Sequence, residues 1–553
     1  MFDELDLSTI EDERLRELVA RLLNLGEQVT TDRRAAQAEI QRLRDEINRL
    51  KGEQGRPDIK AKGSGGSGSG TGNSSSEKKR FKPKGREGRS KIERLEVTRE
   101  EIVVVDRAQL PGDAEFKGYE EVTVQDVCLE AETIRFRKEK FYSPGAQRTY
   151  LAELPTGYEG QFGPGIRALV VVWYFASTIS EPKILELLHS LGVAISAGEV
   201  SNMVIKEQDA FHSERAEAFQ AGLESSPWHH HDQTSTRVAG DNQSCQITCH
   251  PLDTNYHTTE RKDRPSVVQA LMGGQPLSYR FNAETFALLE QRQVSVTTRS
   301  QLQLKAPQDV ELDEASLQAW LDQHGAQVGA ITRQRIADAA AVAAYHAQTE
   351  WPVIRLLVGD DAPQFNLITE ELALCWIHEG RHSTKLTPLV AHHRLLVEHF
   401  CDRFWNYSDE LLAYRQHPTL AERQRLEAAF DTLFATRTGY WALDDRMART
   451  RQKKQPLLMV LEHPEISLHN NPAELGARAR VRKREVSFGP RTRDGTAAWD
   501  TFQSLAATTK KLGLNFIHYV RDRIAGANTI PRLADLIRQQ ATELNLGASW
   551  PSG

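Results

Sequence analysis

Three acidic residues stand in settings that suit metal-dependent chemistry on phosphodiesters. Asp360 follows the mostly apolar run 353–358, which predicts a buried strand, and Asp232 precedes a second strand-like segment. Glu474 follows Pro472, a residue that suits the first position of a helix. Carboxylates are the ligands that Mg²⁺ prefers, and two such ions about 3.5–4 Å apart can activate the attacking oxygen and stabilise the leaving oxygen. Taken singly, each acid also fits a turn or a helix cap.

Two further polar residues, His378 and Arg381, follow the strand-like run 372–377. A guanidinium can neutralise a scissile phosphate and an imidazole can position it. A structural pair at a strand end is the alternative interpretation.

Histidine and cysteine are also grouped around Asp232, at His229, His230, His231, Cys245, Cys249 and His250. Their spacing matches no closed tetrahedral zinc site, and neighbouring histidines on a strand point to opposite faces. The five cysteines are an odd, scattered set, which favours reduced thiols over a disulfide framework. We expect Cys375 in the core, because a phosphodiester reaction at metal ions needs no thiol.

Composition and charge set wider bounds. The 553 residues are 39% hydrophobic and 26% charged, as in a soluble protein of several domains. The longest apolar run, 168–176, is too short to cross a bilayer, and the acidic N-terminus is unlike a secretion signal, so we expect a cytoplasmic protein without a membrane partner. The net charge of −6 conceals basic clusters at 78–94 and 478–493, which are either phosphate-binding patches or solvated faces.

The N-terminal region is predicted to be a long helix over residues 10–51. Apolar residues recur every seven positions, which indicates a coiled coil and self-association, with a single helix packed on its own domain as the alternative. The stripe consists of Leu15, Leu22, Val29, Ala36, Leu43 and Leu50. A tether of Gly, Ser, Thr and Asn follows at 63–76, before the first basic cluster.

Residues 95–155 contain short β-like runs, such as 101–105 and 121–124, which predict a small β-rich module. From Gly163 the pattern becomes helical: two apolar helices, a break at Gly192, and a capping box from Ser196 to Glu199 that starts a third helix. This is the layout of a helix-turn-helix, whose last helix enters a major groove, although helical hairpins without a DNA role are common.

Several stretches together resemble a known family. Leu357-Val358-Gly359-Asp360, Cys375-Trp376-Ile377-His378-Glu379-Gly380-Arg381 and Asn470-Asn471-Pro472-Ala473-Glu474, with Arg482-Lys483 and Phe488 behind them, look like the successive signatures of DDE-type transposases of the insertion-sequence-sixty-six family. His231-Asp232-Gln233-Thr234 resembles their first-acid motif, where D-E-T is usual. The helices from Phe162 to Val204 and the segment 504–520 also match, so the resemblance covers most of residues 160–525 in order.

The resemblance implies a multidomain α/β protein with an N-terminal coiled coil, a helix-turn-helix region and an RNase H-like catalytic core with helical insertions. The expected domains are 1–52 (coiled-coil arm), 53–94 (flexible linker and basic segment), 95–160 (β-rich module), 161–210 (helix-turn-helix), 211–525 (catalytic domain, with insertions at about 270–350 and 388–450) and 526–553 (C-terminal helix and tail).

The implied function is metal-dependent DNA cleavage and strand transfer, with Asp232, Asp360 and Glu474 as catalytic acids and ligands of Mg²⁺, or of Mn²⁺ as a substitute. His378 and Arg381 would assist them. The implied partners are the terminal inverted repeats of the element, a target DNA, further copies of the chain through the coiled coil, and accessory transposition proteins at the nucleoid. A DNA-binding relative without catalysis and a metal-dependent nuclease are the alternatives.

The sequence departs from the family pattern at three places. His469 stands where Asp usually precedes the paired Asn, and Leu475 stands where Arg usually follows the third acid. Many members carry a zinc module of paired CxxC near residues 95–155, where only Cys128 is found here.

Overall fold

The structure is a computed structural model that describes residues 10–50, 97–106, 114–127, 129–324 and 328–547. The chain divides into two units, residues 34–133 and the remainder (1–33 with 134–553). The predicted Gly/Ser tether, the first basic cluster and Cys128 lie outside the described residues.

Helix α1 (Glu13–Leu50) confirms the predicted N-terminal helix. One of its faces packs on the large unit, where Leu23 contacts Val390 and the Asn24 amide donates to the carbonyl of Gly439 at 2.9 Å. The Glu27 carboxylate accepts hydrogen bonds from the backbone N–H groups of Leu389 and Val390. The heptad residues whose exposure is described include Leu22 and Val29, at 58% and 65% exposed. The coiled coil therefore stays a prediction.

The predicted β-rich module is largely absent from the described residues. Neither 101–105 nor 121–124 forms a strand, and both runs are exposed throughout. The strands found in this region pair as an antiparallel hairpin, β1 (Lys140–Ser143) and β2 (Arg148–Leu151). The β-like composition was misleading because strand propensity measures fit to a half-buried surface, and no element covers these runs.

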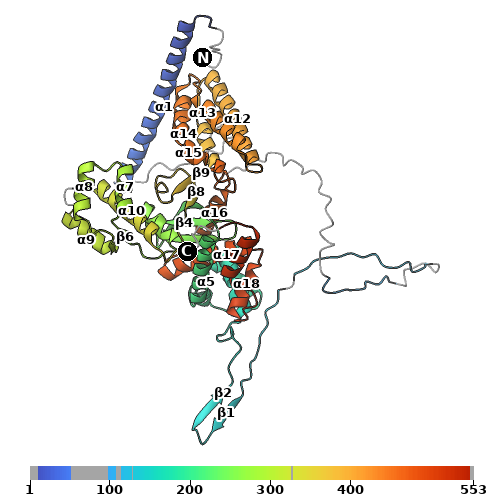
Figure 1. The fold of residues 1–553 in the computed structure, drawn as a ribbon. Coiled ribbons are helices and arrows are strands. Elements are labelled where there is room, and N and C mark those ends of the chain that lie inside the picture. Colours follow the sequence, from blue (N-terminus) through green and yellow to red (C-terminus); the bar gives the residue numbers. More distant parts are fainter. Residues whose placement is uncertain (1–9, 51–96, 107–113, 128, 325–327, 548–553) are drawn as a thin grey trace. The chain divides into compact units, whose positions relative to one another are not determined.

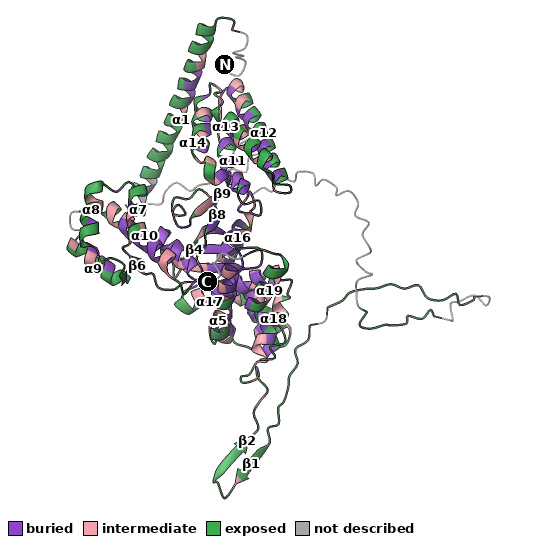
Figure 2. Cartoon of the chain, viewed as in Figure 1, coloured by how far each residue is buried: buried purple, intermediate pink, exposed green. Residues whose placement is uncertain are grey.

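A mixed five-stranded sheet lies at the centre of the large unit (Figure 1). Its strands, in spatial order, are β5 (Thr254–Thr259), β4 (Asp241–Cys249), β3 (Trp228–Val238), β8 (Leu356–Gly359) and β9 (Glu371–Leu374). β3, β4 and β5 pair antiparallel, whereas β8 runs parallel to both β3 and β9. The sheet interior is buried (Figure 2), which explains why strand β8 reads as a continuous apolar run.

Helix α17 (Arg493–Lys511) covers the free edge of β5. Its side chains accept hydrogen bonds from the outward N–H groups of that strand: Thr258 to Asp500 Oδ2 (2.7 Å), Tyr256 to Ser504 Oγ (2.9 Å) and Thr254 to Thr508 Oγ1 (3.2 Å). Four residues of helix advance by about 6 Å and two residues of strand by about 6.8 Å. The spacing of every fourth helical residue therefore matches that of every second strand residue. Polar side chains of α17 thus accept the hydrogen bonds that a sixth strand would otherwise accept.

Two helical insertions interrupt the sheet, as expected for 270–350 and 388–450. The first has its own core and comprises α6 (Arg264–Leu271), β6 (Tyr279–Arg280), α7 (Ala283–Gln291), α8 (Val296–Lys305), β7 (Glu311–Leu312), α9 (Glu314–His324) and α10 (Ala330–Ala347). The second follows β9 and comprises α11 (Trp376–Thr384), α12 (Ala391–Tyr414), α13 (Leu420–Ala435), α14 (Trp441–Gln452), α15 (Lys454–Leu457) and η4 (Met459–Leu461). Aromatic side chains of α12 and α13, including Phe404 and Phe430, pack on Trp376 in a separate core.

The three helices predicted after Gly163 are present as α2 (Pro164–Phe175), α3 (Glu181–Ser190) and α4 (Ala197–Ile205). Ser196 accepts a hydrogen bond from the backbone N–H of Glu199 at 3.2 Å, which is the expected N-cap contact. These helices share a core with α5 (Asp209–Glu224), α17, α18 (Phe516–Ile524) and α19 (Leu533–Glu543). Within the described parts of the chain, no helix has the length and apolar character needed to span a membrane.

Candidate active site

Asp232 lies on β3, and Asp360 comes directly after the neighbouring strand β8 at the corresponding position. The parallel register pairs His230 with Val358, so each acid is two residues beyond a matched pair. Asp360 comes directly after β8, as predicted, but Asp232 lies within β3 and not at its end. Strand β3 continues to Val238 because β4 pairs with it along the whole of that length.

Glu474 is in the first turn of α16 (Asn471–Ser487), with Pro472 at the helix start, as the sequence predicted. Asn470 fixes this helix start against the sheet. Its Nδ2 donates to the carbonyl of His231 at 2.7 Å, and its Oδ1 lies 3.1 Å from Nδ1 of His230. Burial lowers the pKa of His230 to about 3, so the ring is neutral and can donate one proton to Asn470.

The pKa of Asp232 is affected by its burial and by the charges of the other two acids. Burial raises the pKa of Asp232 from 3.8 to about 6, and the negative charges of Asp360 and Glu474 add to the rise, against the opposing N–H of Gln233. The Gln233 N–H donates to Asp232 Oδ1 at 2.7 Å. Grouped carboxylates repel one another unless cations lie between them. The site is therefore suited to cation binding.

His378 and Arg381 are on helix α11, since β9 ends at Leu374 and the predicted strand 372–377 is too long. Both reach Glu474: His378 Nδ1 is 3.6 Å from its Oε1, and an Arg381 Nη is 3.8 Å from its Oε2. All five predicted site residues are thus in one region, with His378 and Arg381 beside Glu474.

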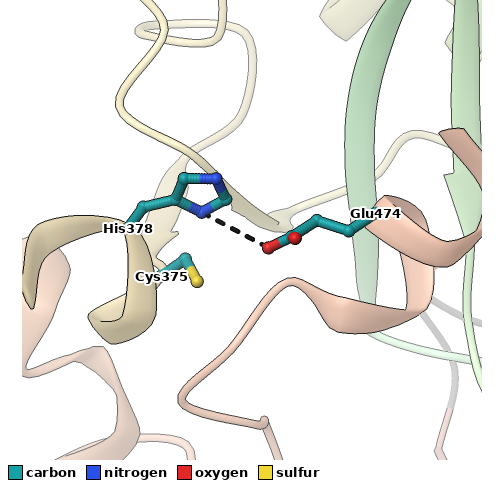
Figure 3. Close-up of side chains that lie close together, drawn as sticks. All are labelled: Cys375, His378 and Glu474. Carbon is teal, nitrogen blue, oxygen red and sulfur yellow. Dashed lines mark ion pairs between the residues drawn. The ribbon is translucent and has the colours of Figure 1, made fainter. Parts of the chain in front are cut away.

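Cys375 is buried, as expected, but it also faces the site (Figure 3). Its sulfur accepts a hydrogen bond from the backbone N–H of Asn470 at 3.2 Å. One donor atom each of Cys375, His378 and Glu474 lie within 4.8 Å of one another. Among the described residues, the histidines and cysteines around Asp232 form no such group.

Comparison with known proteins identifies the family of the chain. The family described as Transposase IS66 family matches residues 159–263, which include Asp232. A protein of Sinorhizobium fredii (strain NBRC 101917 / NGR234), the uncharacterised protein y4jO, is 32% identical over 331 residues, covering 58% of this chain and 99% of that protein. The chain belongs to the IS66 transposase family. No solved structure matches it.

Membership of the IS66 family associates this chain with transposition and DNA recombination. One departure from the family pattern, Leu475, directly follows Glu474. Leu475 is 61% exposed. Arg478, one turn further along α16, has an Nη 3.7 Å from Glu474 Oε2. A cation therefore accompanies the third acid although the residue directly after it is apolar.

A network of ion pairs around the buried Glu379 supports α11 in this IS66 member. Glu379 pairs with Arg446 and accepts a hydrogen bond from Thr450 Oγ1 at 2.5 Å. Lys453 Nζ lies 3.2 Å from Glu379 Oε2 and 2.5 Å from Asp361 Oδ2, so it connects α11 to the residue after Asp360.

The second basic cluster is only in part a surface patch. Arg480 is buried and pairs with Asp500, and the buried Lys483 places its ammonium 3.1 Å from the ring centroid of Tyr174. Burial lowers the pKa of Lys483 to about 7. The exposed cations of the cluster are Arg478, Arg482, Arg491 and Arg493.

Sequence reasoning missed Asn470 and Lys453 as supports of the site. Asn470 was noted only within a family signature, and its polar side chain beside Pro472 was the available signal. For Lys453 no signal existed, because its partners Asp361 and Glu379 lie far away in sequence.

Proposed function

We propose that this chain is a DDE-type transposase that binds the ends of its insertion sequence, cleaves them and transfers the strand to a target DNA. The observation that carries the proposal is the grouping of Asp232, Asp360 and Glu474: burial raises the pKa of Asp232, and the charges of the other two acids add to that rise. The sheet order, with three antiparallel strands followed by two parallel ones, supports an RNase H-like core around these acids.

The residues present fit a pair of Mg²⁺ ions. The donors are carboxylates, and the negative charges of Asp360 and Glu474 act on Asp232. Glu474 Oε1 is buried without a hydrogen-bond partner in the described part of the chain. When bound, Mg²⁺ or Mn²⁺ activates the attacking oxygen and stabilises the leaving oxygen of an in-line displacement. Asp232 and Asp360 would hold the ions from the sheet, and Glu474 would complete the set from α16.

The protein's own groups would place the scissile phosphate against these acids. The Arg381 side chain is 44% exposed and 3.8 Å from Glu474, so its guanidinium can contact a DNA phosphate while pairing with that acid. His378 lies on the same face of α11 and would orient the phosphate or the attacking group. Asn470 would keep α16 in register with β3, so that Glu474 stays opposite Asp232.

DNA binding would use the helix-turn-helix and the exposed cations. Helix α4 buries Val200, Met203 and Val204 and leaves Asn202 and Lys206 exposed at its end, which suits entry into a major groove. Arg482, Arg491 and Arg493 would contact phosphates on the catalytic side. The exposed heptad stripe of α1 would associate with a second copy, and accessory transposition proteins would act on this assembly.

The test uses purified full-length protein and labelled duplex DNA carrying the terminal inverted repeats that flank the gene. Cutting at the repeat tip should require Mg²⁺ or Mn²⁺ and should be lost in Asp232→Asn, Asp360→Asn and Glu474→Gln, while repeat binding by gel shift remains. Asp241→Asn, an exposed aspartate at the start of β4, is the matched control and should cut normally.

Two results would replace the proposal. Binding of the repeats without cutting by the wild type would favour the DNA-binding relative. Cutting without joining to target DNA, irrespective of the repeat sequence, would favour a metal-dependent nuclease.

A further inference from the structure

His378 and Glu474 face each other across a gap that neither fills. His378 Nδ1 and Glu474 Oε1 are 3.6 Å apart, beyond hydrogen-bond distance. Both atoms are buried, and neither has a hydrogen-bond partner among the residues that the structure describes. Unsatisfied buried polar atoms are costly, so two of them aimed at one point indicate an occupant that interacts with both.

The third wall of this gap is the sulfur of Cys375, which points toward the other two side chains (Figure 3). Cys375 is the N-cap of α11; burial raises the pKa of its thiol, and the backbone N–H groups of His378, Asn470 and Ile377 oppose that rise. One sulfur, one imidazole nitrogen and one carboxylate oxygen form a donor set for Zn²⁺, whereas Mg²⁺ takes oxygen ligands.

The spacing of the atoms agrees with a tetrahedral ion. Zinc–ligand lengths of about 2.0–2.3 Å place neighbouring ligand atoms roughly 3.3–3.8 Å apart. The His378–Glu474 separation of 3.6 Å lies within this range, and the full set spans 4.8 Å, which small side-chain rotations would close. The cations Arg381 and Arg478 approach Glu474 through Oε2 and leave Oε1 free.

We propose that Cys375, His378 and Glu474 form a second metal site, which takes Zn²⁺ or a similar thiol-binding divalent ion and removes Glu474 from the catalytic set when it is filled. Binding forms a metal–sulfur bond and releases the thiol proton of Cys375 to solvent. A fourth position stays open to water. Zinc occupancy would thus inhibit DNA cutting. The inhibition rests on the proposed function, but the binding does not.

The binding test uses Co²⁺ as a spectroscopic probe for Zn²⁺ on the metal-free full-length protein. We expect a near-ultraviolet thiolate-to-cobalt absorption band at one equivalent, which Zn²⁺ abolishes and excess Mg²⁺ does not. Cys375→Ser should lose the band and His378→Ala should weaken Co²⁺ binding at least tenfold. Cys401 is a half-buried cysteine on α12, outside the proposed site, so Cys401→Ser should keep both the absorption band and the Co²⁺ affinity. Circular dichroism checks that each variant is folded.

The inhibition test titrates Zn²⁺ into the cutting reaction at constant Mg²⁺, with each variant compared with its own zinc-free rate. Half-inhibition of Cys375→Ser should need at least tenfold more Zn²⁺ than that of the wild type or Cys401→Ser. A wild type without the band, or a band that persists in Cys375→Ser, overturns the site. Equal inhibition of all variants overturns the regulatory role. A wild type that never cuts DNA contradicts the proposed function and leaves the spectroscopic result standing.

Discussion

Replacing Asp232 by asparagine should make the metal-free protein more stable at neutral pH. The folded protein holds the proton of this carboxyl more tightly than the unfolded chain does, because its pKa rises from 3.8 to about 6 on folding. Stability from this group is therefore greatest at low pH and is lost as the pH rises through that window. The rise corresponds to about 3 kcal/mol of unfavourable interaction of the ionised form at pH 7.

Asparagine has nearly the same shape and can still accept the Gln233 N–H, but it does not ionise. The assay is thermal unfolding of wild type and Asp232→Asn in EDTA between pH 4 and 8. The stability difference should be small near pH 4, grow up to about pH 6 and level off in favour of the variant. Asp241→Asn, exposed at the start of β4, should show no such growth.

Mg²⁺ provides an independent second measurement. A ligand at a hundred times its Kd stabilises the folded state by about 2.7 kcal/mol. Saturating Mg²⁺ should therefore stabilise the wild type and not the variant, and so reduce or reverse the difference at pH 7. A variant that is less stable than the wild type at pH 7 in EDTA, or a difference that does not change with pH, would refute the reasoning that burial and the neighbouring acids disfavour the ionised form of Asp232.

Two further substitutions test how the site is supported. Lys453→Met leaves Asp361 without its bridge to Glu379, so the cutting rate at saturating DNA should fall at least tenfold while DNA affinity stays within about twofold. Lys454→Met is the control, because it removes the partly exposed ion pair with Asp431. Equal cutting rates in the two variants would contradict the bridging role of Lys453. Gly476→Ala places a methyl group 2.8 Å from Ile247 Cγ2 and should destabilise the protein by about 1–3 kcal/mol. The cutting activity that Gly476→Ala loses should be recovered in part when Ile247→Ala is added. Gly26→Ala in α1, with open space around it, should not lower the stability. If Ile247→Ala recovers no cutting activity, α16 is not held by this contact.

The sequence predicted those parts of the fold whose signal is local. Helix α1 and helices α2 to α4 follow from apolar periodicity and capping, and Glu474 was placed in a first turn by Pro472. The position of Asp232 within its strand was missed because Trp228–Val238 is mostly polar. Two of its buried histidines, His230 and His231, lie within hydrogen-bond distance of side chains from other segments, Asn470 and Gln246.

The second basic cluster, 478–493, also shows that the sequence alone does not reveal which polar side chains are buried. The sequence suggests that Arg480 and Lys483 are surface cations. In the structure both are buried, Arg480 in an ion pair with Asp500 and Lys483 against the ring of Tyr174. Composition reports how many charges a segment has, and only the tertiary structure decides which of them meet solvent. The five candidate residues could be named from the sequence, and the structure brings them into one region, whereas the contacts of Asn470 and Lys453 that support them required the structure.

The side-chain cover on β5 has a consequence for incomplete chains. A product that ends before α17 would contain the residues of α2 to α4 and all three acids, but the N–H groups of Thr254, Tyr256 and Thr258 would lose their acceptors. An open strand edge of this kind recruits other strands and promotes aggregation. Truncated chains should therefore be removed by precipitation or proteolysis, so the presence of the last helices decides which copies of the chain persist.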